Sequence, residues 1–174
     1  MTRPVVVLVG LPGSGKSTVG RLLADRLGVG FRDTDADVER EAGLAVRDIL
    51  LDRGEAAFRV LEREAVGRAL AGHPGVLAVG GGAVLDDTTQ RLLAGHRVVH
   101  LVVDPATAAG RVGTARSRPL LADDPAGELR VLASVRTPIY DRLARDRVRT
   151  DDDTPDGAAA EIVAWLAASR AATV

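Results

Sequence analysis

Short runs of apolar residues alternate along the chain with longer segments in which apolar residues recur at helical spacing. Runs rich in Val and Leu at residues 5–10, 76–79 and 98–103 predict buried strands. Weaker signals of the same kind lie at residues 31–32 and 147–149. Helical spacing, together with stop and start residues, predicts helices over residues 16–27, 46–70 (broken near Gly54), 87–94 and 156–169, and one that begins at Asp104-Pro105.

Strands that are separated by helices are typical of a parallel sheet with right-handed crossovers. We therefore expect an α/β protein of three layers, α/β/α, with a parallel sheet of about five strands in a single domain over residues 1–174. The polar segments 114–127 and 150–156 lack periodicity and predict exposed loops. The first of them is expected to form a lid, inserted at about residues 112–126.

Composition narrows the classes of function. The 174 residues carry 23 basic against 24 acidic side chains, a net charge of −1 that argues against a nucleic-acid partner. The chain has no cysteine, which excludes disulfides and thiol nucleophiles. No run approaches the roughly 20 apolar residues of a membrane span, and the first apolar run is too short for a signal peptide, so we expect a cytoplasmic protein with no membrane partner.

The strongest motif is Gly10-Leu11-Pro12-Gly13-Ser14-Gly15-Lys16-Ser17, which matches G-x-x-x-x-G-K-[ST]. It lies directly after a predicted strand and before a predicted helix, which is the context that a phosphate-binding loop requires. Glycines let backbone N–H groups turn toward phosphate oxygens, Lys16 can reach the outer phosphates, and the Ser17 hydroxyl can bind magnesium. The motif predicts nucleotide binding but does not distinguish a kinase from a hydrolase or a switch.

Two aspartates follow the predicted strand at residues 31–32. Because the strand at 76–79 ends in glycines, Asp33 is the best candidate for the acid that holds magnesium through water, and Asp35 could orient or deprotonate an acceptor hydroxyl. The same segment, Asp33-Thr34-Asp35, is also typical of a helix cap before Val38, and the sequence leaves the functional and the capping interpretation open.

A triple glycine and three arginines complete the candidate site. Gly80-Gly81-Gly82 is either a flexible turn or a place where the backbone approaches a ligand, and its position after a buried strand favours the second. Arg118 is the expected lid arginine, while Arg59 and Arg136 are candidates for bidentate contact with an anionic acceptor. In a chain whose basic residues are all arginine except Lys16, each arginine also has an ordinary surface interpretation.

Taken in order, GLPGSGKST, DTD at 33–35, Phe58-Arg59, GGG at 80–82, RPLL at 118–121 and RTPIY at 136–140 resemble the shikimate kinase family. This family belongs to the nucleoside-monophosphate-kinase-like P-loop proteins, and the resemblance extends from residue 5 to about residue 162. It implies a P-loop kinase fold with a lid, and a monomer that uses ATP and Mg²⁺ to phosphorylate the 3-hydroxyl of shikimate.

The resemblance also implies a role for each residue of the candidate site. The implied catalytic residues are Lys16, Asp35 and Arg118, and the implied magnesium ligands are Ser17 and Asp33. The shikimate-binding residues would be Asp35, Arg59, Arg136, Gly80, Gly81 and Gly82. The nucleotide-binding residues would be Gly13, Ser14, Gly15, Lys16, Ser17, Thr18, Arg111, Arg118 and Pro155.

Two other functions stay open at this point. One is another small-molecule kinase of the same fold, acting on gluconate or on a nucleoside monophosphate. The other is a non-catalytic ATP-binding module. A nucleotide acceptor calls for a base-binding pocket, and an aromatic content of 2% offers little for stacking.

Overall fold

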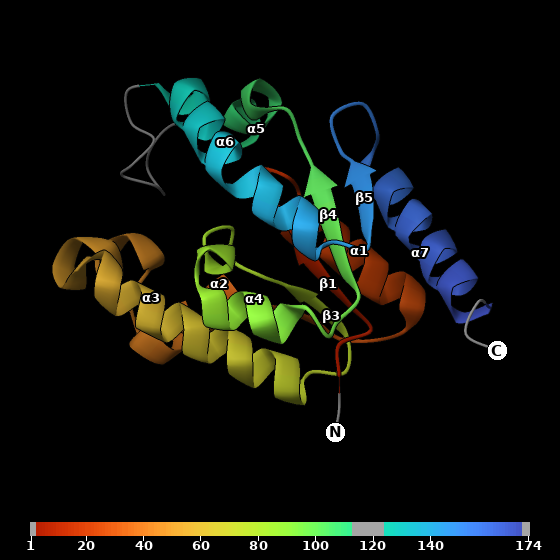
Figure 1. The fold of residues 1–174 in the computed structure, drawn as a ribbon, viewed down its shortest axis with the longest axis horizontal. Coiled ribbons are helices and arrows are strands. Elements are labelled where there is room, and N and C mark those ends of the chain that lie inside the picture. Colours follow the sequence, from red (N-terminus) through yellow and green to blue (C-terminus); the bar gives the residue numbers. More distant parts are fainter. Residues whose placement is uncertain (1–2, 113–123, 172–174) are drawn as a thin grey trace.

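The computed structural model describes residues 3–112 and 124–171 (Figure 1). Five strands alternate with helices in this part of the chain, as the sequence pattern predicts. The strands are β1 (Val6–Val9), β2 (Phe31–Asp33), β3 (Val76–Ala78), β4 (Val98–Val102) and β5 (Asp146–Arg149). The helices are α1 (Lys16–Leu27), α2 (Thr34–Ala42), α3 (Val46–Gly72), η1 (Ala83–Leu85, a 3₁₀ turn), α4 (Asp87–Leu93), α5 (Pro105–Val112), α6 (Pro125–Leu143) and α7 (Pro155–Ala171).

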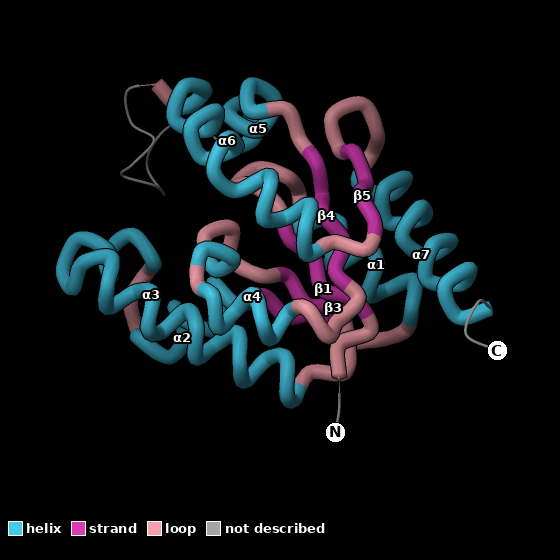
Figure 2. The backbone as a smooth tube through the Cα atoms, viewed as in Figure 1, coloured by secondary structure: helices cyan, strands magenta, loops and turns pink. Residues whose placement is uncertain are grey.

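The strands form one parallel sheet in the order β2-β3-β1-β4-β5, which confirms the predicted α/β class and strand number (Figure 2). β1 lies at the centre, where Val7 is opposite Leu77 of β3 and Val98 of β4. Because all the strands run the same way, their carboxyl ends meet at one edge of the sheet. The phosphate loop, Asp33 and the triple glycine all follow strands there, and open parallel sheets bind their ligands at this edge.

Both faces of the sheet are covered by helices. Helices α3, α4, α5 and α6 lie on one side of it, and α1 and α7 on the other (Figure 1). Val7 and Val9 of β1 pack with the first group, while Val6 and Leu8 pack with the second. All four of these residues are at most 1% exposed, which is why β1 reads as an unbroken apolar run in the sequence. The predicted three-layer arrangement is confirmed.

The helix boundaries follow from local signals that the sequence carries. α1 begins and ends at the predicted residues and stops at Gly28, whose φ of 64° is the left-handed conformation that ends many helices. α3 is kinked at Gly54 (φ 79°), where the pattern predicts a break. A small apolar cluster of Val38, Ile49 and Phe58 packs α2 against α3.

Helix α6 is not predicted by the sequence pattern. Only Leu129 and Tyr140 are buried along it and Pro138 lies inside it, so its apolar periodicity is weak. The loop predicted over residues 114–127 is therefore wrong at its end, where Asp124 accepts a hydrogen bond from the Gly127 N–H and caps α6. Similarly, residue 112 and residues 125–126 of the expected lid belong to α5 and α6.

Residues 113–123 of the expected lid, including Arg118, lie outside the described residues. Within residues 3–112 and 124–171, no helix combines the length and the apolar character that crossing a membrane requires.

Candidate active site

The phosphate loop runs from β1 into the first turn of α1. Gly10, Gly13 and Gly15 adopt φ values of 152°, 80° and 89°, a region that side chains disfavour. Gly10 and Gly13 are also crowded, because a Cβ at either would lie 2.6 Å from the carbonyl oxygen of Leu101 or Ala108. The loop thus needs glycine both for its turns and for its close packing on neighbouring backbone.

Lys16 folds back over the phosphate loop. Its ammonium donates hydrogen bonds to the carbonyl oxygens of Gly10 (2.8 Å) and Leu11 (2.9 Å). These contacts hold the charge at the mouth of the loop, next to the N-terminus of α1, where the helix dipole favours an anion. The positions of Lys16 and α1 suit the binding of a phosphate chain.

Asp33 links the end of β2 to both the phosphate loop and α2. One carboxylate oxygen accepts a hydrogen bond from the Ser17 hydroxyl at 2.7 Å, and the other accepts from the Asp35 N–H at 3.0 Å. Asp33 is therefore the N-cap of α2, which confirms the capping interpretation. The same carboxylate also reaches Ser17, so the cap and a metal-binding role are compatible.

A cavity of about 380 Å³ lies at the carboxyl edge of the sheet. It is lined by both aspartates and by residues of the phosphate loop and of the triple glycine, among them Lys16, Ser17, Asp33, Asp35, Gly81 and Arg111. Gly13, Gly15 and Thr18 line it as well, whereas Ser14 is buried behind the loop. The structure thus brings most of the predicted nucleotide and metal residues to one cavity.

Arg59 lies beside this cavity on α3, held by two acids of the same helix. Its guanidinium pairs with Glu62 at 2.7 Å and with Glu55 at 3.0 Å. Burial lowers the pKa of Arg59, but the charges and hydrogen bonds of the two glutamates outweigh it, so the net shift is upward. The guanidinium is fixed as a cation that points toward Gly82.

Space is limited at the triple glycine, whereas none of its φ values is in the left-handed range. A Cβ at Gly80 would collide with the Asp35 carboxylate and lie 2.8 Å from Glu62 Oε1. A Cβ at Gly82 would collide with the guanidinium of Arg59. The sequence predicts close approach to a ligand. The structure shows close approach to the charged side chains of Asp35, Glu62 and Arg59, on the side where the sequence predicts the acceptor.

Glu62 is a central residue of this side that the sequence analysis missed. Its side chain is 3% exposed, and its charge interacts with Arg59, Asp35 and Arg136. Burial and the nearby Asp35 raise the pKa of Glu62, while Arg59 and Arg136 oppose the shift. The available signal was its i, i+3 spacing from Arg59, the spacing of paired charges on a helix.

Arg136 comes to the same place from α6. Its Nε is buried and has no hydrogen-bond partner among the residues that the structure describes. A buried donor without a partner is costly, so this N–H is suited to donate a hydrogen bond to an anionic ligand. The structure thus gathers Arg59, Arg136 and Asp35 around one buried glutamate.

Tyr140 ties α6 to the triple glycine. Its fully buried hydroxyl donates to the Gly81 carbonyl at 2.5 Å, and its ring lies 5.0 Å from the ring of His100 on β4. Gly81 in turn packs near the phosphate loop, because a Cβ there would be 3.2 Å from the Gly10 carbonyl. The two glycine-rich turns are therefore neighbours.

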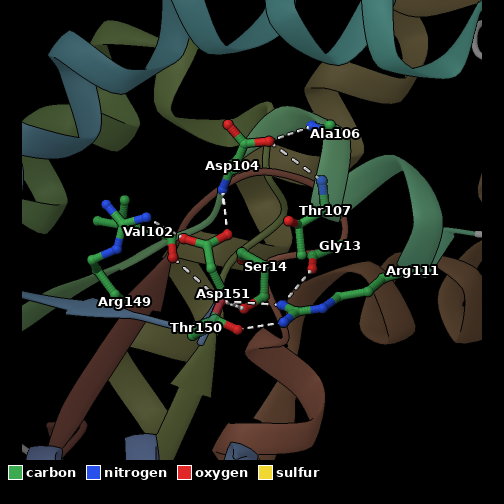
Figure 3. A network of polar contacts seen from close by, with 10 residues as sticks. All are labelled: Gly13, Ser14, Val102, Asp104, Ala106, Thr107, Arg111, Arg149, Thr150 and Asp151. Carbon is green, nitrogen blue, oxygen red and sulfur yellow. Dashed lines mark hydrogen bonds and ion pairs between the residues drawn. The ribbon is translucent and has the colours of Figure 1, made fainter. Parts of the chain in front are cut away.

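Arg111 lines the cavity on the side where the resemblance predicts adenine, and Figure 3 shows the polar contacts that hold its guanidinium. The Arg111 guanidinium donates to the hydroxyl of Thr150 at 3.2 Å, to the Thr150 carbonyl and, at 3.5 Å, to the Gly13 carbonyl. Pro155 is exposed at the first residue of α7 and is not among the residues that line this cavity. Its predicted contact with the nucleotide stays a prediction.

This fold and site define a P-loop kinase: a phosphate loop follows the central strand, and a separate set of charged residues stands beside it for an acceptor. A shikimate kinase family model matches residues 12–167. The chain is 54% identical to a shikimate kinase from Thermobifida fusca over 97% of this chain and 98% of that one. The chain belongs to the shikimate kinase family and is an enzyme, a kinase.

Solved structures agree with this assignment. A shikimate kinase from Acinetobacter baumannii, solved in complex with shikimate, superposes with a TM-score of 0.92 at 31% identity, covering 97% of this chain and 95% of that one. A gluconokinase from Sinorhizobium meliloti reaches a TM-score of 0.55 at 21% identity, covering 93% and 90% of the two chains. The second likeness concerns the fold alone.

Proposed function

We propose that this enzyme transfers the γ-phosphoryl group of ATP to the 3-hydroxyl of shikimate, giving shikimate 3-phosphate and ADP on the route to chorismate and the aromatic amino acids. The observation that carries the proposal is the grouping of Arg59, Arg136 and Asp35 around Glu62, next to the phosphate loop. The two guanidinium groups, Arg59 and Arg136, are suited to bind a carboxylate of the acceptor. The Asp35 carboxylate, between them and the phosphate loop, is suited to take the proton of an acceptor hydroxyl.

The phosphate loop holds the donor. Its N–H groups and Lys16 bind the phosphates, and the Lys16 ammonium exchanges the carbonyls of Gly10 and Leu11 for phosphate oxygens when ATP arrives. We assign Arg111, which lines the cavity, and Pro155, at the first residue of α7, to the adenine side. Arg118 keeps the role implied by the resemblance, that of a catalytic arginine at the phosphates.

Magnesium fits the oxygen donors at the start of α1. Ser17 and Asp33 offer a hydroxyl and a carboxylate that are already 2.7 Å apart. Within the described residues no group of three or more His, Cys, Asp or Glu side chains could hold a metal ion, which suits an ion that binds together with nucleotide phosphates and water. When bound, magnesium neutralises phosphate charge; Ser17 and Asp33 are the residues that hold it.

On the acceptor side, Arg59 and Arg136 bind the shikimate carboxylate, and the backbone of Gly80, Gly81 and Gly82 borders the ring. Asp35 orients the 3-hydroxyl and accepts its proton as the oxygen attacks the γ-phosphorus, and the bond from that phosphorus to the bridging oxygen of ADP breaks. Such transfer needs positioning and charge neutralisation more than covalent help from the protein. We further propose that the enzyme works as a cytoplasmic monomer of one domain.

The test is a coupled assay of ADP release with purified protein, ATP and magnesium. Shikimate, gluconate and nucleoside monophosphates are compared in parallel, and shikimate methyl ester serves as an acceptor that keeps the hydroxyl but lacks the carboxylate charge. We expect rapid turnover with shikimate, and a much higher KM for the ester. Turnover on gluconate or a nucleotide without turnover on shikimate would overturn the proposal, and no acceptor-dependent release at all would indicate an ATP-binding module.

A further inference from the structure

Thr150 is a buried polar residue whose contacts the proposed reaction does not use. It lies directly after β5, is 4% exposed, and packs behind the phosphate loop (Figure 3). Its N–H donates to the Val102 carbonyl at 2.9 Å, and its hydroxyl lies 3.1 Å from the Ser14 carbonyl and 3.2 Å from that of Val102. The hydroxyl has a single proton to donate, and the Ser14 carbonyl is the nearer of its two possible acceptors.

Arg111 fixes the other side of the same hydroxyl. One guanidinium nitrogen donates to Thr150 Oγ1 at 3.2 Å and lies 3.5 Å from the Gly13 carbonyl, while the second donates to the Thr150 carbonyl. The hydroxyl thus accepts from a cation and donates to Ser14, and a donor that is polarised by a charged partner makes a stronger hydrogen bond.

Hydrogen bonds connect the loop after β5 to both ends of α5. Asp151 accepts a hydrogen bond from the Asp104 N–H at 2.6 Å and pairs with Arg149 at 2.7 Å. Asp104 caps α5 by accepting from the Ala106 N–H at 2.8 Å, and Arg111 returns from the last turn of α5 to Thr150. These contacts place the Thr150 hydroxyl against Ser14 with little freedom to move.

The Ser14 carbonyl controls the direction of a neighbouring amide. The peptide bond between Ser14 and Gly15 is trans, as are all those in the described residues. The Ser14 C=O and the Gly15 N–H therefore point in opposite directions from the same peptide plane. Gly15 has no side chain to restrain that unit, and its nearest potential Cβ contact is 3.7 Å away. Holding the carbonyl behind the loop therefore directs the Gly15 N–H to the side where Gly15 and Lys16 line the cavity.

We propose that Thr150 is a positioning residue for the nucleotide: its hydroxyl, held by Arg111, fixes the Ser14 carbonyl and so keeps the Gly15 N–H directed at the phosphates. This inference rests on the proposed role of the loop as the donor site. It does not depend on which acceptor is used.

The test compares Thr150→Val, which removes the hydroxyl but keeps the shape, with Thr150→Ser, which keeps the hydroxyl. Isothermal titration with ADP should show affinity about tenfold lower for Thr150→Val and close to wild type for Thr150→Ser, as the loss of one hydrogen bond predicts. In turnover, the KM for ATP should rise while the KM for shikimate stays unchanged. Thr89→Val, at a fully buried threonine of α4, is the matched control and should leave ADP affinity unchanged.

Two outcomes would overturn the inference: ADP affinity of Thr150→Val equal to that of wild type, or an equal loss in Thr150→Ser. If Thr150→Val folds poorly, hydrogen exchange at the Gly15 amide, measured by NMR on the folded fraction with saturating ADP, decides. Protection equal to wild type contradicts the inference, and faster exchange supports it. Because ADP binding needs no acceptor, a failure of shikimate turnover in the wild-type enzyme would be seen separately.

Discussion

Two glycine-rich turns stand side by side at the carboxyl edge of the sheet, and each needs glycine for a different reason. Gly15 of the phosphate loop has a φ of 89° and ample room, since its nearest potential Cβ contact is 3.7 Å away. Gly82 has an ordinary φ of −93°, but a Cβ there would run into the Arg59 guanidinium. The first turn depends on backbone conformation and the second on free space.

We attribute this difference to the ligand that we propose for each turn, phosphate at the first and the acceptor at the second. The phosphate loop presents backbone amides, so its shape is its function, and neighbouring groups such as Thr150 hold it from behind. The acceptor side presents side chains from α2, α3 and α6, and its glycines leave room for them. Substitutions should therefore affect the two sides separately, and four predictions test whether they do, ordered from the largest expected effect.

The largest effect is expected at Asp35, which stands between the two turns. Asp35→Asn keeps the size but removes the base, so kcat should fall by about 10²–10⁴-fold, the usual contribution of a general base, with ADP affinity unchanged. Asp33→Asn is the informative control. Asp33 is only two residues from Asp35, but its proposed role is in magnesium binding, so this variant should raise the KM for magnesium ATP instead. Steady-state kinetics and ADP titration measure both. If the two variants behaved alike, the division between the sides would be wrong.

Next comes Gly82→Ala. The new methyl would displace the Arg59 guanidinium, a flexible group that can move, so the protein should fold normally while losing a charged contact to the acceptor. We expect the KM for shikimate to rise roughly tenfold or more, with ADP affinity unchanged. Gly67→Ala on α3 is the matched control, since nothing lies within 4 Å of its potential Cβ and it should leave the KM alone. Unaltered shikimate KM in Gly82→Ala would show that space at this turn is not limiting.

The phosphate loop and the acceptor side also differ in how far the sequence could predict them. The phosphate loop, β1 and α1 are local: a motif, an apolar run and a periodic helix specify them within residues 6–27. The grouping around Glu62 is not local. The pattern of a charged helix such as α3 predicts that an acidic residue is solvent-exposed. Glu62 is buried instead, because Arg59, Gly80 and Arg136 of α6 surround it.

The elements that were missed have physical causes of the same kind. Helix α6 presents a narrow buried side and an internal proline, Pro138, so propensity and periodicity both argue against it, and its position depends on packing with η1, α5 and β4. Thr150 begins a polar run that reads as a loop, and its burial results from contacts with residues 14 and 111 that are distant in the chain. Sequence reasoning predicted candidate residues that the fold brings together, but it did not identify the residues that hold them, such as Glu62 and Thr150.

A third prediction concerns Gly15. Alanine there must adopt a left-handed conformation at a cost of about 1–2 kcal/mol, although its methyl has room. Gly15→Ala should therefore lower the melting temperature and weaken ADP binding, and Gly15→Asn should recover part of both, because asparagine tolerates this conformation better. Thermal unfolding and ADP titration measure the two. Equal losses in both variants would mean that space, as at Gly82, is what matters here too.

The smallest effect concerns stability beneath the two turns, where the His100 ring contacts that of Tyr140 and the charge of Lys16 influences its pKa. Burial lowers the pKa of His100, and Arg147 and Lys16 act in the same direction, outweighing the hydrogen bond and charge of Asp141. Below the ordinary pKa of 6.5, the unfolded chain gains a proton at this position that the folded protein does not take up. The contribution of His100 to the free energy of unfolding should therefore be fully present above pH 6.5. It should decrease as the pH falls below 6.5, by at most about 1.4 kcal/mol per pH unit.

Thermal and denaturant unfolding between pH 5.5 and 7.5 measures that decrease. Burial and the nearby Arg3 also lower the pKa of His96, so part of the slope belongs to it and His96→Asn serves as the comparison. His100→Asn should flatten the slope more than His96→Asn, because His100 is 3% exposed and the group in contact with Tyr140, which holds Gly81. If the pH dependence of stability were unchanged in His100→Asn, burial in the sheet would not be what lowers the pKa of His100.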